Sequence, residues 1–184
     1  MFIYVDLETT GFDANNDQIW EVGMLKTQGC KPIDIYQQLF SVTCPIPVEV
    51  LAQSNMESDM LSAFPAFSSK RDDVRKFIGN GILVAYNAQF EQRFLIAKGV
   101  IPSSQRVIDL YAWVKDMRLP TPNNKLQTIL RYYGFTSSAP HRAINDAFAL
   151  YGLVCKLGWL NRLSSAYISE DDNQGPCRVK AELY

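Results

Sequence analysis

Apolar and β-branched residues gather in five short segments of the chain, and their spacing predicts the strands of one sheet. These segments cover residues 2–8, 18–27, 33–42, 81–87 and the start of 106–118. The first three follow one another through short, turn-rich links, which is typical of an antiparallel meander. The last two run directly into residues with helical spacing, which is typical of β-α units.

Helical spacing begins at residue 56, from where apolar side chains recur every three or four positions. Helices are predicted over 56–64, 67–80, 88–99, the second half of 106–118, 124–134 and 144–158. We expect Asn87 to cap the start of the third of these helices, and Gly99, Gly134 and Gly158 to follow helix ends. The combined pattern predicts an α/β fold with a mixed five-stranded sheet, an antiparallel meander plus parallel strands, flanked by helices.

The bulk composition is that of an ordinary globular chain, with 47% hydrophobic and 20% charged residues in a length of 184. We expect one domain over 1–158, with 159–184 as a C-terminal extension or tail rather than a second domain. The four cysteines lie far apart without a C-x-x-C pair, so reduced thiols are expected. No apolar run approaches the roughly 18 residues of a membrane span, and the amino terminus lacks a basic leader. These features predict a cytoplasmic protein without a membrane partner.

The distribution of charge is more informative than the net charge of −1, which argues against a protein that coats nucleic acid through bulk electrostatics. Residues 1–61 hold nine acidic and two basic side chains, whereas residues 93–142 hold eight basic and two acidic ones. Two solvated faces explain this asymmetry. A metal-binding acidic site beside a basic track for phosphates explains it equally well.

Asp6 and Glu8 end the first predicted strand two residues apart, so the pleat places both carboxylates on one face. Two such oxygen ligands at a strand end can hold a divalent cation. The spacing alone is weak evidence, because solvated acids at a strand end show it too. Glu91 and Asp146 each fall early in a predicted helix, where the helix dipole stabilises a carboxylate even without a ligand role.

Three stretches taken together carry a resemblance that no single acid carries. They are "VDLETTG" at 5–11, "LVAYNAQFE" at 83–91 and "HRAINDA" at 141–147. In order and spacing they resemble the three exonuclease motifs of the DEDDh, or DnaQ-like, nucleases, a family that includes proofreading exonuclease subunits, RNase T and oligoribonuclease. The resemblance extends over residues 2 to about 157 and implies an RNase H-like exonuclease fold.

The second motif departs from the family pattern H-N-A-x-F-D, since Tyr86 stands for the histidine and Glu91 for the aspartate. Glutamate keeps the charge but adds a methylene, which displaces the carboxylate by more than about 1 Å in a site where placement matters. We therefore expect one of the two metal ions to be bound less tightly. A flexible coordination geometry can absorb the change, which favours Mn²⁺ over Mg²⁺.

The resemblance implies hydrolysis of phosphodiesters with two metal ions, Mg²⁺ or Mn²⁺. The implied metal ligands are Asp6, Glu8, Glu91 and Asp146, and His141, the only histidine of the chain, is the implied general base. The implied contacts to the terminal nucleotide are Leu7, Thr9, Thr10, Asn87 and Phe90.

The expected activity is therefore a 3′-to-5′ exonuclease that releases nucleoside 5′-monophosphates from single-stranded or frayed 3′ ends, with DNA favoured over RNA. A polymerase or another replication or repair protein is an expected partner, and a homodimer stays open. Two alternatives remain: a catalytically weakened fold that binds 3′ ends or a polymerase, and an RNA-trimming exoribonuclease, because recognition of a 2′-hydroxyl can depend on a single contact.

Overall fold

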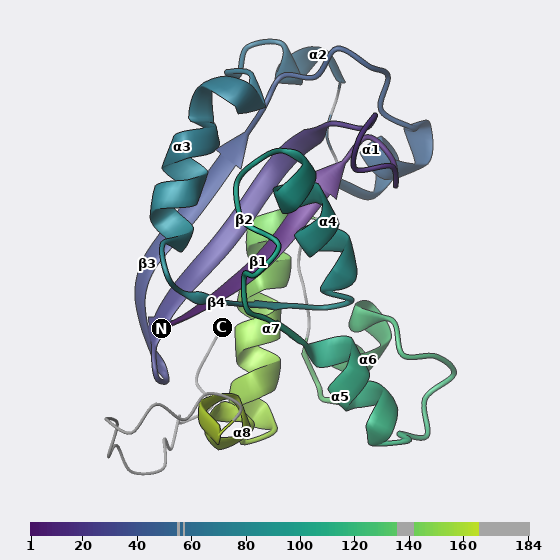
Figure 1. Ribbon diagram of the computed structural model, residues 1–184. Helices are drawn as coiled ribbons and strands as arrows, with labels where there is room; N and C mark the ends of the chain where they lie inside the picture. Colours follow the sequence, from purple (N-terminus) through teal and green to yellow (C-terminus); the bar gives the residue numbers. More distant parts are fainter. Residues whose placement is uncertain (55, 57, 136–141, 166–184) are drawn as a thin grey trace.

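The computed structural model describes residues 1–54, 56, 58–135 and 142–165, and five strands form one mixed sheet in the order β3-β2-β1-β4-β5 (Figure 1). The strands are β1 (Phe2–Thr9), β2 (Ile19–Gln28), β3 (Lys31–Leu39), β4 (Ile82–Ala85) and β5 (Val107–Asp109). The first three pair antiparallel, while β4 pairs parallel with both β1 and β5. The predicted mixed sheet, a meander plus parallel strands, is confirmed.

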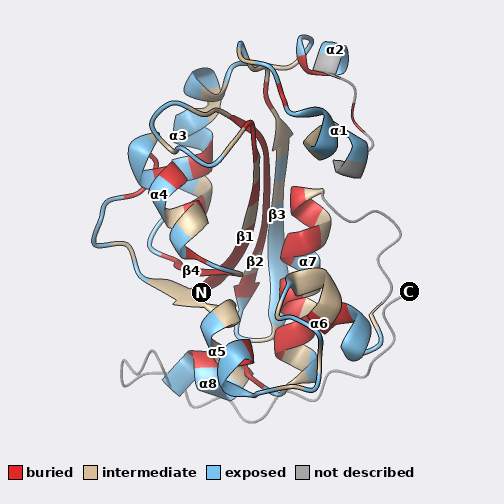
Figure 2. Ribbon diagram, turned by 90° about the vertical axis from the view of Figure 1, so that its right-hand side faces the viewer, coloured by how far each residue is buried: buried red, intermediate tan, exposed pale blue. Residues whose placement is uncertain are grey.

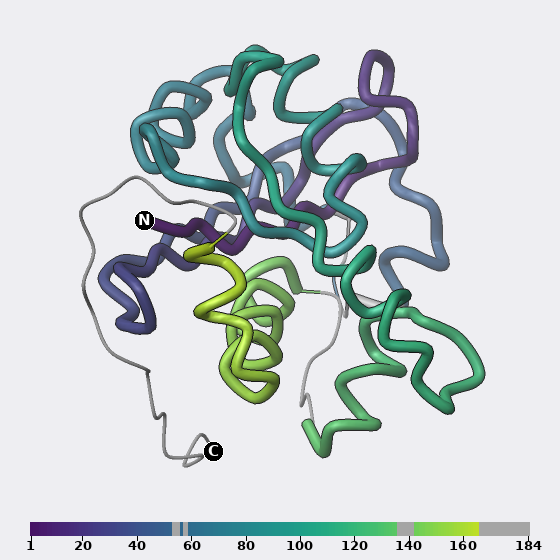
Figure 3. The backbone as a smooth tube through the Cα atoms, turned by 60° about the horizontal axis from the view of Figure 1, so that its bottom comes forward, coloured from purple at the N-terminus to yellow at the C-terminus, as the bar shows by residue number. Residues whose placement is uncertain are grey.

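Helices cover both faces of this sheet, with α3 and α4 on one side and α7 with α6 on the other (Figure 2). The helices are α1 (Val48–Ser54), α2 (Ser58–Leu61), α3 (Phe67–Ile78), α4 (Gln89–Ala97), α5 (Leu110–Asp116), α6 (Leu126–Tyr132), α7 (Ala143–Lys156) and α8 (Leu160–Ser165). In Figure 3 the segment with α5 and α6 lies on one side of α7 and the hairpin between β2 and β3 on the other. The longest helix, α7, therefore crosses the middle of one sheet face.

The pleat of β1 divides its side chains between two cores. Ile3 and Val5 pack in the cluster under α3 and α4, whereas Phe2 and Tyr4 pack in the cluster under α7. These residues are almost fully buried, and burying a side chain of this size stabilises the fold by about 1.5–3 kcal/mol. The alternation continues along the strand, so the residues at positions 6 and 8 point to the α7 side.

The link from β4 to α4 differs from the prediction that Asn87 caps the helix. Asn87 has a positive φ of 63°, and the N-cap position is occupied by Ala88, which makes no side-chain cap bond. The Asn87 backbone N–H donates instead to Asp109 Oδ1 at 2.9 Å. Asparagine tolerates the left-handed conformation, so here it makes the tight turn out of the strand rather than the cap.

Glycines with positive φ follow α4, α6 and α7, as predicted, at Gly99, Gly134 and Gly158. Two short helices were not predicted. Helix α1 starts directly after Pro47, whose carbonyl accepts hydrogen bonds from the helix, and α8 buries Leu163 in the core under α7. Elements of six or seven residues span fewer than two turns, so an apolar repeat does not develop along them.

The expectation of reduced thiols is correct for Cys44 and Cys155, which are free. It is wrong for Cys30, which is disulfide-bonded. Of the predicted C-terminal extension, 159–184, residues 160–165 form α8, and those from 166 onward lie outside the described part of the chain. Within that part, no helix has the length and apolar character needed to cross a bilayer.

Candidate active site

Three carboxylates from two distant parts of the chain meet on the α7 side of the sheet. Asp6 and Glu8 come from β1, and Asp146 comes from the first turn of α7. One oxygen of each lies within 4.8 Å of one oxygen of each of the others. Such spacing suits hard oxygen ligands around a divalent cation.

Asp146 is held in this position by backbone and side-chain contacts. Its side chain is buried, with 6% of the residue exposed, and its backbone N–H donates to the carbonyl of Arg142 at 3.1 Å. Gln127 of α6 donates from Nε2 to Asp146 Oδ1 at 3.0 Å. Helix α6 thus orients the carboxylate.

The proximity of these acids, together with their burial, disfavours their charged forms. Burial raises the pKa of Asp6 well above its usual value, and the charges of Glu8, Asp146, Glu91 and Glu21 raise that pKa further. Burial first, and then the charges of Asp146 and Glu21, raise the pKa of Glu8 to about 8, while the Arg142 guanidinium lowers it. A bound cation relieves this repulsion, so the donor set fits a metal site on electrostatic as well as geometric grounds.

Glu91, the fourth predicted ligand, lies in the first turn of α4, where only 4% of the residue is exposed. Its Oε2 atom is buried without a hydrogen-bond partner among the described residues. Burial raises the pKa of Glu91 to about 8, with a smaller contribution from the charge of Asp109. It does not join the three carboxylates that lie within 4.8 Å of one another, but its charge acts on Asp6. A buried carboxylate oxygen without a hydrogen-bond partner, beside an acidic cluster, fits the role of a metal ligand.

His141, the predicted general base, lies outside the described residues. The residue that follows it, Arg142, is the N-cap of α7. The motif therefore leads into the helix that carries Asp146.

Three of the predicted substrate contacts, Leu7, Thr9 and Thr10, lie at or just after the end of β1. The side chain of Leu7 packs in the core under α3 and α4, on the sheet face opposite the three carboxylates. Thr9 and Thr10 are buried, and their hydroxyls bond within the loop after β1, to the carbonyl of Gly11 at 2.6 Å and to Asp17 at 3.1 Å. The side chains of these three residues thus shape the strand end.

Aromatic side chains lie beside the same loop. Phe90 is half-buried against the core, and its ring lies 6.2 Å from that of Phe12 in an edge-to-face arrangement. Phe12 itself is 83% exposed. The prediction omitted it, although a phenylalanine directly after "TTG" in a polar turn is a signal that the sequence contains.

A cavity of about 480 Å³ opens beside the ends of β4 and β5. Its lining includes Tyr86, Asn87, Tyr111 and Lys125. The Tyr86 hydroxyl donates to the carbonyl of Asn124 at 2.5 Å and so ties the loop before α6 to β4. Two phenol rings, amides and one cation together suit a base and a phosphate.

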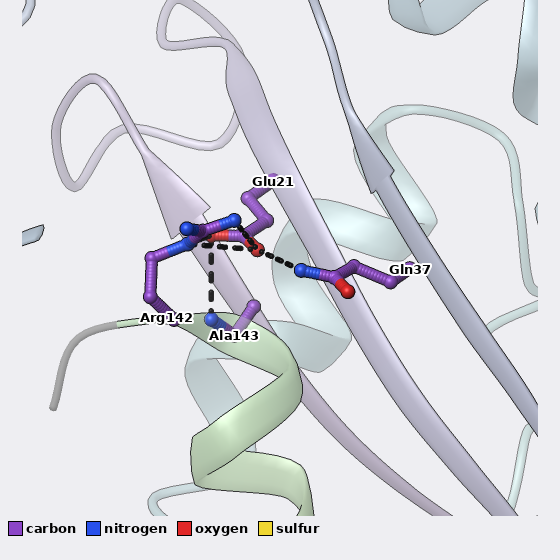
Figure 4. Close-up of polar contacts among 4 residues, drawn as sticks. All are labelled: Glu21, Gln37, Arg142 and Ala143. Carbon is purple, nitrogen blue, oxygen red and sulfur yellow. Dashed lines mark hydrogen bonds and ion pairs between the residues drawn. The ribbon is translucent and has the colours of Figure 1, made fainter. Parts of the chain in front are cut away.

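Glu21 of β2 is a buried acid that the predicted site did not include. It pairs in register with Glu8 across the antiparallel strands and is bonded to Arg142 (Figure 4). The signal in the sequence was an acid between Trp20 and Val22, inside an otherwise apolar strand. Arg142, counted above among the basic residues of a phosphate track, is occupied by this contact.

Comparison with known proteins identifies sequence relatives along most of the chain. A family model described as an exonuclease matches residues 3–154. The epsilon subunit of DNA polymerase III from Treponema pallidum is 33% identical over 152 residues, which cover 79% of this chain and 71% of the subunit. A PolC-type DNA polymerase III from Clostridium perfringens is 26% identical over 80% of this chain but only 10% of its own length. The chain therefore corresponds to a small part of the PolC-type relatives.

Solved structures share the fold at low sequence identity. Exonuclease I superposes with a TM-score of 0.74 at 15% identity, over 89% of this chain and 43% of that protein. Exonuclease X, in complex with 5′ overhanging duplex DNA, superposes with a TM-score of 0.67 at 18% identity, over 92% and 95% of the two chains. The predicted RNase H-like exonuclease fold is confirmed by these neighbours.

Proposed function

Because this chain belongs to the exonuclease family of DnaQ-like nucleases, we propose that it hydrolyses the terminal phosphodiester at the 3′ end of a DNA strand and releases nucleoside 5′-monophosphates. The observation that carries the proposal is the convergence of Asp6, Glu8 and Asp146 within 4.8 Å. Single-stranded or frayed 3′ ends are the proposed substrates, since an unpaired terminal nucleotide can enter a site framed by a loop and exposed rings.

The three carboxylates, with Glu91, are the proposed holders of two ions of Mg²⁺ or Mn²⁺. When bound, these ions supply positive charge to the phosphate and lower the pKa of bound water. We assign the general base to His141 on its place in the third motif, because an imidazole with a pKa near 6.5 can take a proton at neutral pH. The water oxygen bonds to phosphorus as its proton passes to an imidazole nitrogen. The bond from phosphorus to the 3′ oxygen of the preceding nucleotide breaks, and that oxygen takes a proton from solvent to become the new 3′-hydroxyl.

The cavity beside the site is the proposed path of the strand that precedes the terminal nucleotide. Lys125 supplies a cation for a phosphate, and the rings of Tyr86 and Tyr111 supply apolar surface for a base. A polymerase is the proposed partner, by analogy with the relatives named as polymerase subunits. The near-neutral net charge is consistent with a partner that helps to hold DNA.

A labelled oligonucleotide assay tests the activity directly. We expect the full chain to shorten a single-stranded DNA from its 3′ end with Mn²⁺ or Mg²⁺, to release 5′-monophosphates, and to stop when a chelator is added. Labelling the 5′ end and then the 3′ end gives the direction, and a matched RNA of the same sequence gives the sugar preference.

One outcome favours the alternative of a binding module: DNA bound equally well in chelator and in Mn²⁺, with no shortening in either metal. Glu91 in place of the family aspartate is the feature that motivates this alternative. Shortening of RNA alone supports the exoribonuclease alternative instead.

We also propose that the exposed ring of Phe12 stacks on the terminal base, and Phe12→Ala tests this contact. Because Phe12 is exposed and a stacked base is worth about 1–3 kcal/mol, we expect KM for a single-stranded DNA to rise by about 5- to 150-fold. The melting temperature should stay unchanged, since little apolar surface is lost from the core. A KM equal to that of the wild type in steady-state kinetics rules out the stacking role, and Phe12→Tyr, which keeps the ring, is the matched control.

A further inference from the structure

We propose that Glu21 is a positioning residue of the active site. Its carboxylate, through Arg142, holds the first turn of α7 against the sheet and so places Asp146 opposite the carboxylates of β1. This inference rests on the proposed function, because it concerns the geometry of the same metal site.

The carboxylate of Glu21 is fully buried and accepts hydrogen bonds from three residues (Figure 4). Arg142 donates from Nε to Oε2 at 3.0 Å and from Nη2 to Oε1 at 3.1 Å, a two-point contact that fixes direction as well as distance. The backbone N–H of Ala143 donates to Oε2 at 3.4 Å, and Gln37 of β3 donates to Oε1 at 3.1 Å. One side chain of β2 thus connects β3 with the start of α7.

This ion pair differs from the others found in the described part of the chain. Those lie within α3, among exposed side chains one to three residues apart. The Glu21 contact joins residues 121 positions apart, and the side chains are 0% and 26% exposed. A buried ion pair pays a desolvation cost that often cancels its attraction, so stability alone does not explain one. It does fix one arrangement of the two elements, since neither charge can leave its partner.

The backbone of β2 supports the same contact two residues further on. Gly23 lies on the same face as Glu21, and a Cβ atom built on it would lie 2.1 Å from the nitrogen of Ile144 and 2.2 Å from the carbonyl carbon of Ala143. The first turn of α7 therefore rests directly on the strand backbone. The carboxylate at position 21 and the missing side chain at position 23 together define where the helix begins.

The position of Arg142 is passed to Asp146 through one helical turn. The Arg142 carbonyl accepts hydrogen bonds from the backbone N–H groups of Asn145 at 2.8 Å and Asp146 at 3.1 Å. A shift of Arg142 therefore moves the Asp146 backbone, while Gln127 restrains only its side chain. Misplacement of a metal ligand by about 1 Å is enough to cost catalysis.

Glu21→Gln tests this role, because it keeps the size of the side chain and removes its charge. We expect kcat to fall by about 10- to 100-fold, and the affinity for Mn²⁺, measured without substrate by electron paramagnetic resonance, to fall by about tenfold or more. The KM for DNA should change by less than about threefold, since the substrate contacts are untouched. Asp73→Asn, which removes an exposed ion pair of α3, is the matched control and should leave all three values unchanged.

Arg142→Lys keeps the buried pair charged but removes the two-point contact, so it serves if Glu21→Gln does not fold. We expect a folded protein with lower kcat and weaker Mn²⁺ binding. A variant that melts earlier but keeps the wild-type kcat and Mn²⁺ affinity overturns the positioning role. A wild-type protein that binds Mn²⁺ but cleaves nothing refutes the proposed function, and the Mn²⁺ affinities of the variants then still decide the role of Glu21.

Discussion

Asp146→Asn lowers the nuclease activity by at least about 10³-fold and leaves the fold intact, if the three carboxylates hold the metal ions. The amide has the shape of the carboxylate, and its oxygen can still accept the hydrogen bond from Gln127. What is lost is a negative charge within 4.8 Å of Asp6 and Glu8. Because the transition state of phosphoryl transfer is stabilised mainly by charge and position, loss of one ligand acts on the chemical step.

Single-turnover cleavage of a labelled single strand in saturating Mn²⁺ measures this effect. The melting temperature should equal or exceed that of the wild type, since a repulsive charge is removed from a buried cluster. Asp73→Asn on α3, far from this cluster, is the control for loss of one acid. An Asp146→Asn protein that cleaves within tenfold of the wild-type rate would falsify the assignment of Asp146 as a ligand.

In the absence of divalent cations, the protein melts at a lower temperature near pH 8 than near pH 5. In the folded protein the pKa of Glu8 and that of Glu91 are raised to about 8, and the pKa of Asp6 is raised as well. The unfolded chain ionises these groups near their usual values, so above about pH 4.5 it binds fewer protons than the folded chain. The free energy of unfolding therefore falls as pH rises through this window.

Thermal unfolding by circular dichroism, in chelator and in Mn²⁺ over pH 5 to 8, measures the effect. We expect a drop of more than about 4 °C across the window in chelator, where about 1 kcal/mol corresponds to 2–4 °C for a chain of this size. Mn²⁺ should remove most of the drop, because the cation offsets the repulsion among the carboxylates. Glu8→Gln, which does not titrate, should flatten the profile. A flat profile for the wild type in chelator is the contrary result.

The acidic residues behind both predictions could be placed in their strand or helix from the sequence alone. The placement of Asp6 and Glu8 on one face followed from the pleat of a strand, and the structure shows the two carboxylates side by side. The early position of Asp146 in its helix followed from apolar spacing of 3 or 4 residues. Motif order then linked these acids, although nothing local shows that they meet.

Other features could not be predicted from single segments. The left-handed turn at Asn87 depends on a hydrogen bond to Asp109, which lies on the neighbouring strand. The bond from Gln127 to Asp146 depends on how α6 lies beside α7. Glu21 is the clearest example, since an acid in a strand is ordinary until its partner 121 residues away is known.

The sequence by itself determined the five strands and the longer helices, the two-residue spacing of the first acids and the family to which the chain belongs. These properties depend on backbone periodicity and on neighbours in the chain, which the order of residues records directly. The tertiary structure decided which distant groups meet: the three carboxylates, the ion pair of Glu21 and the close approach of α7 to Gly23. Such contacts depend on how whole elements pack, because burial and close packing act on surfaces assembled from many segments.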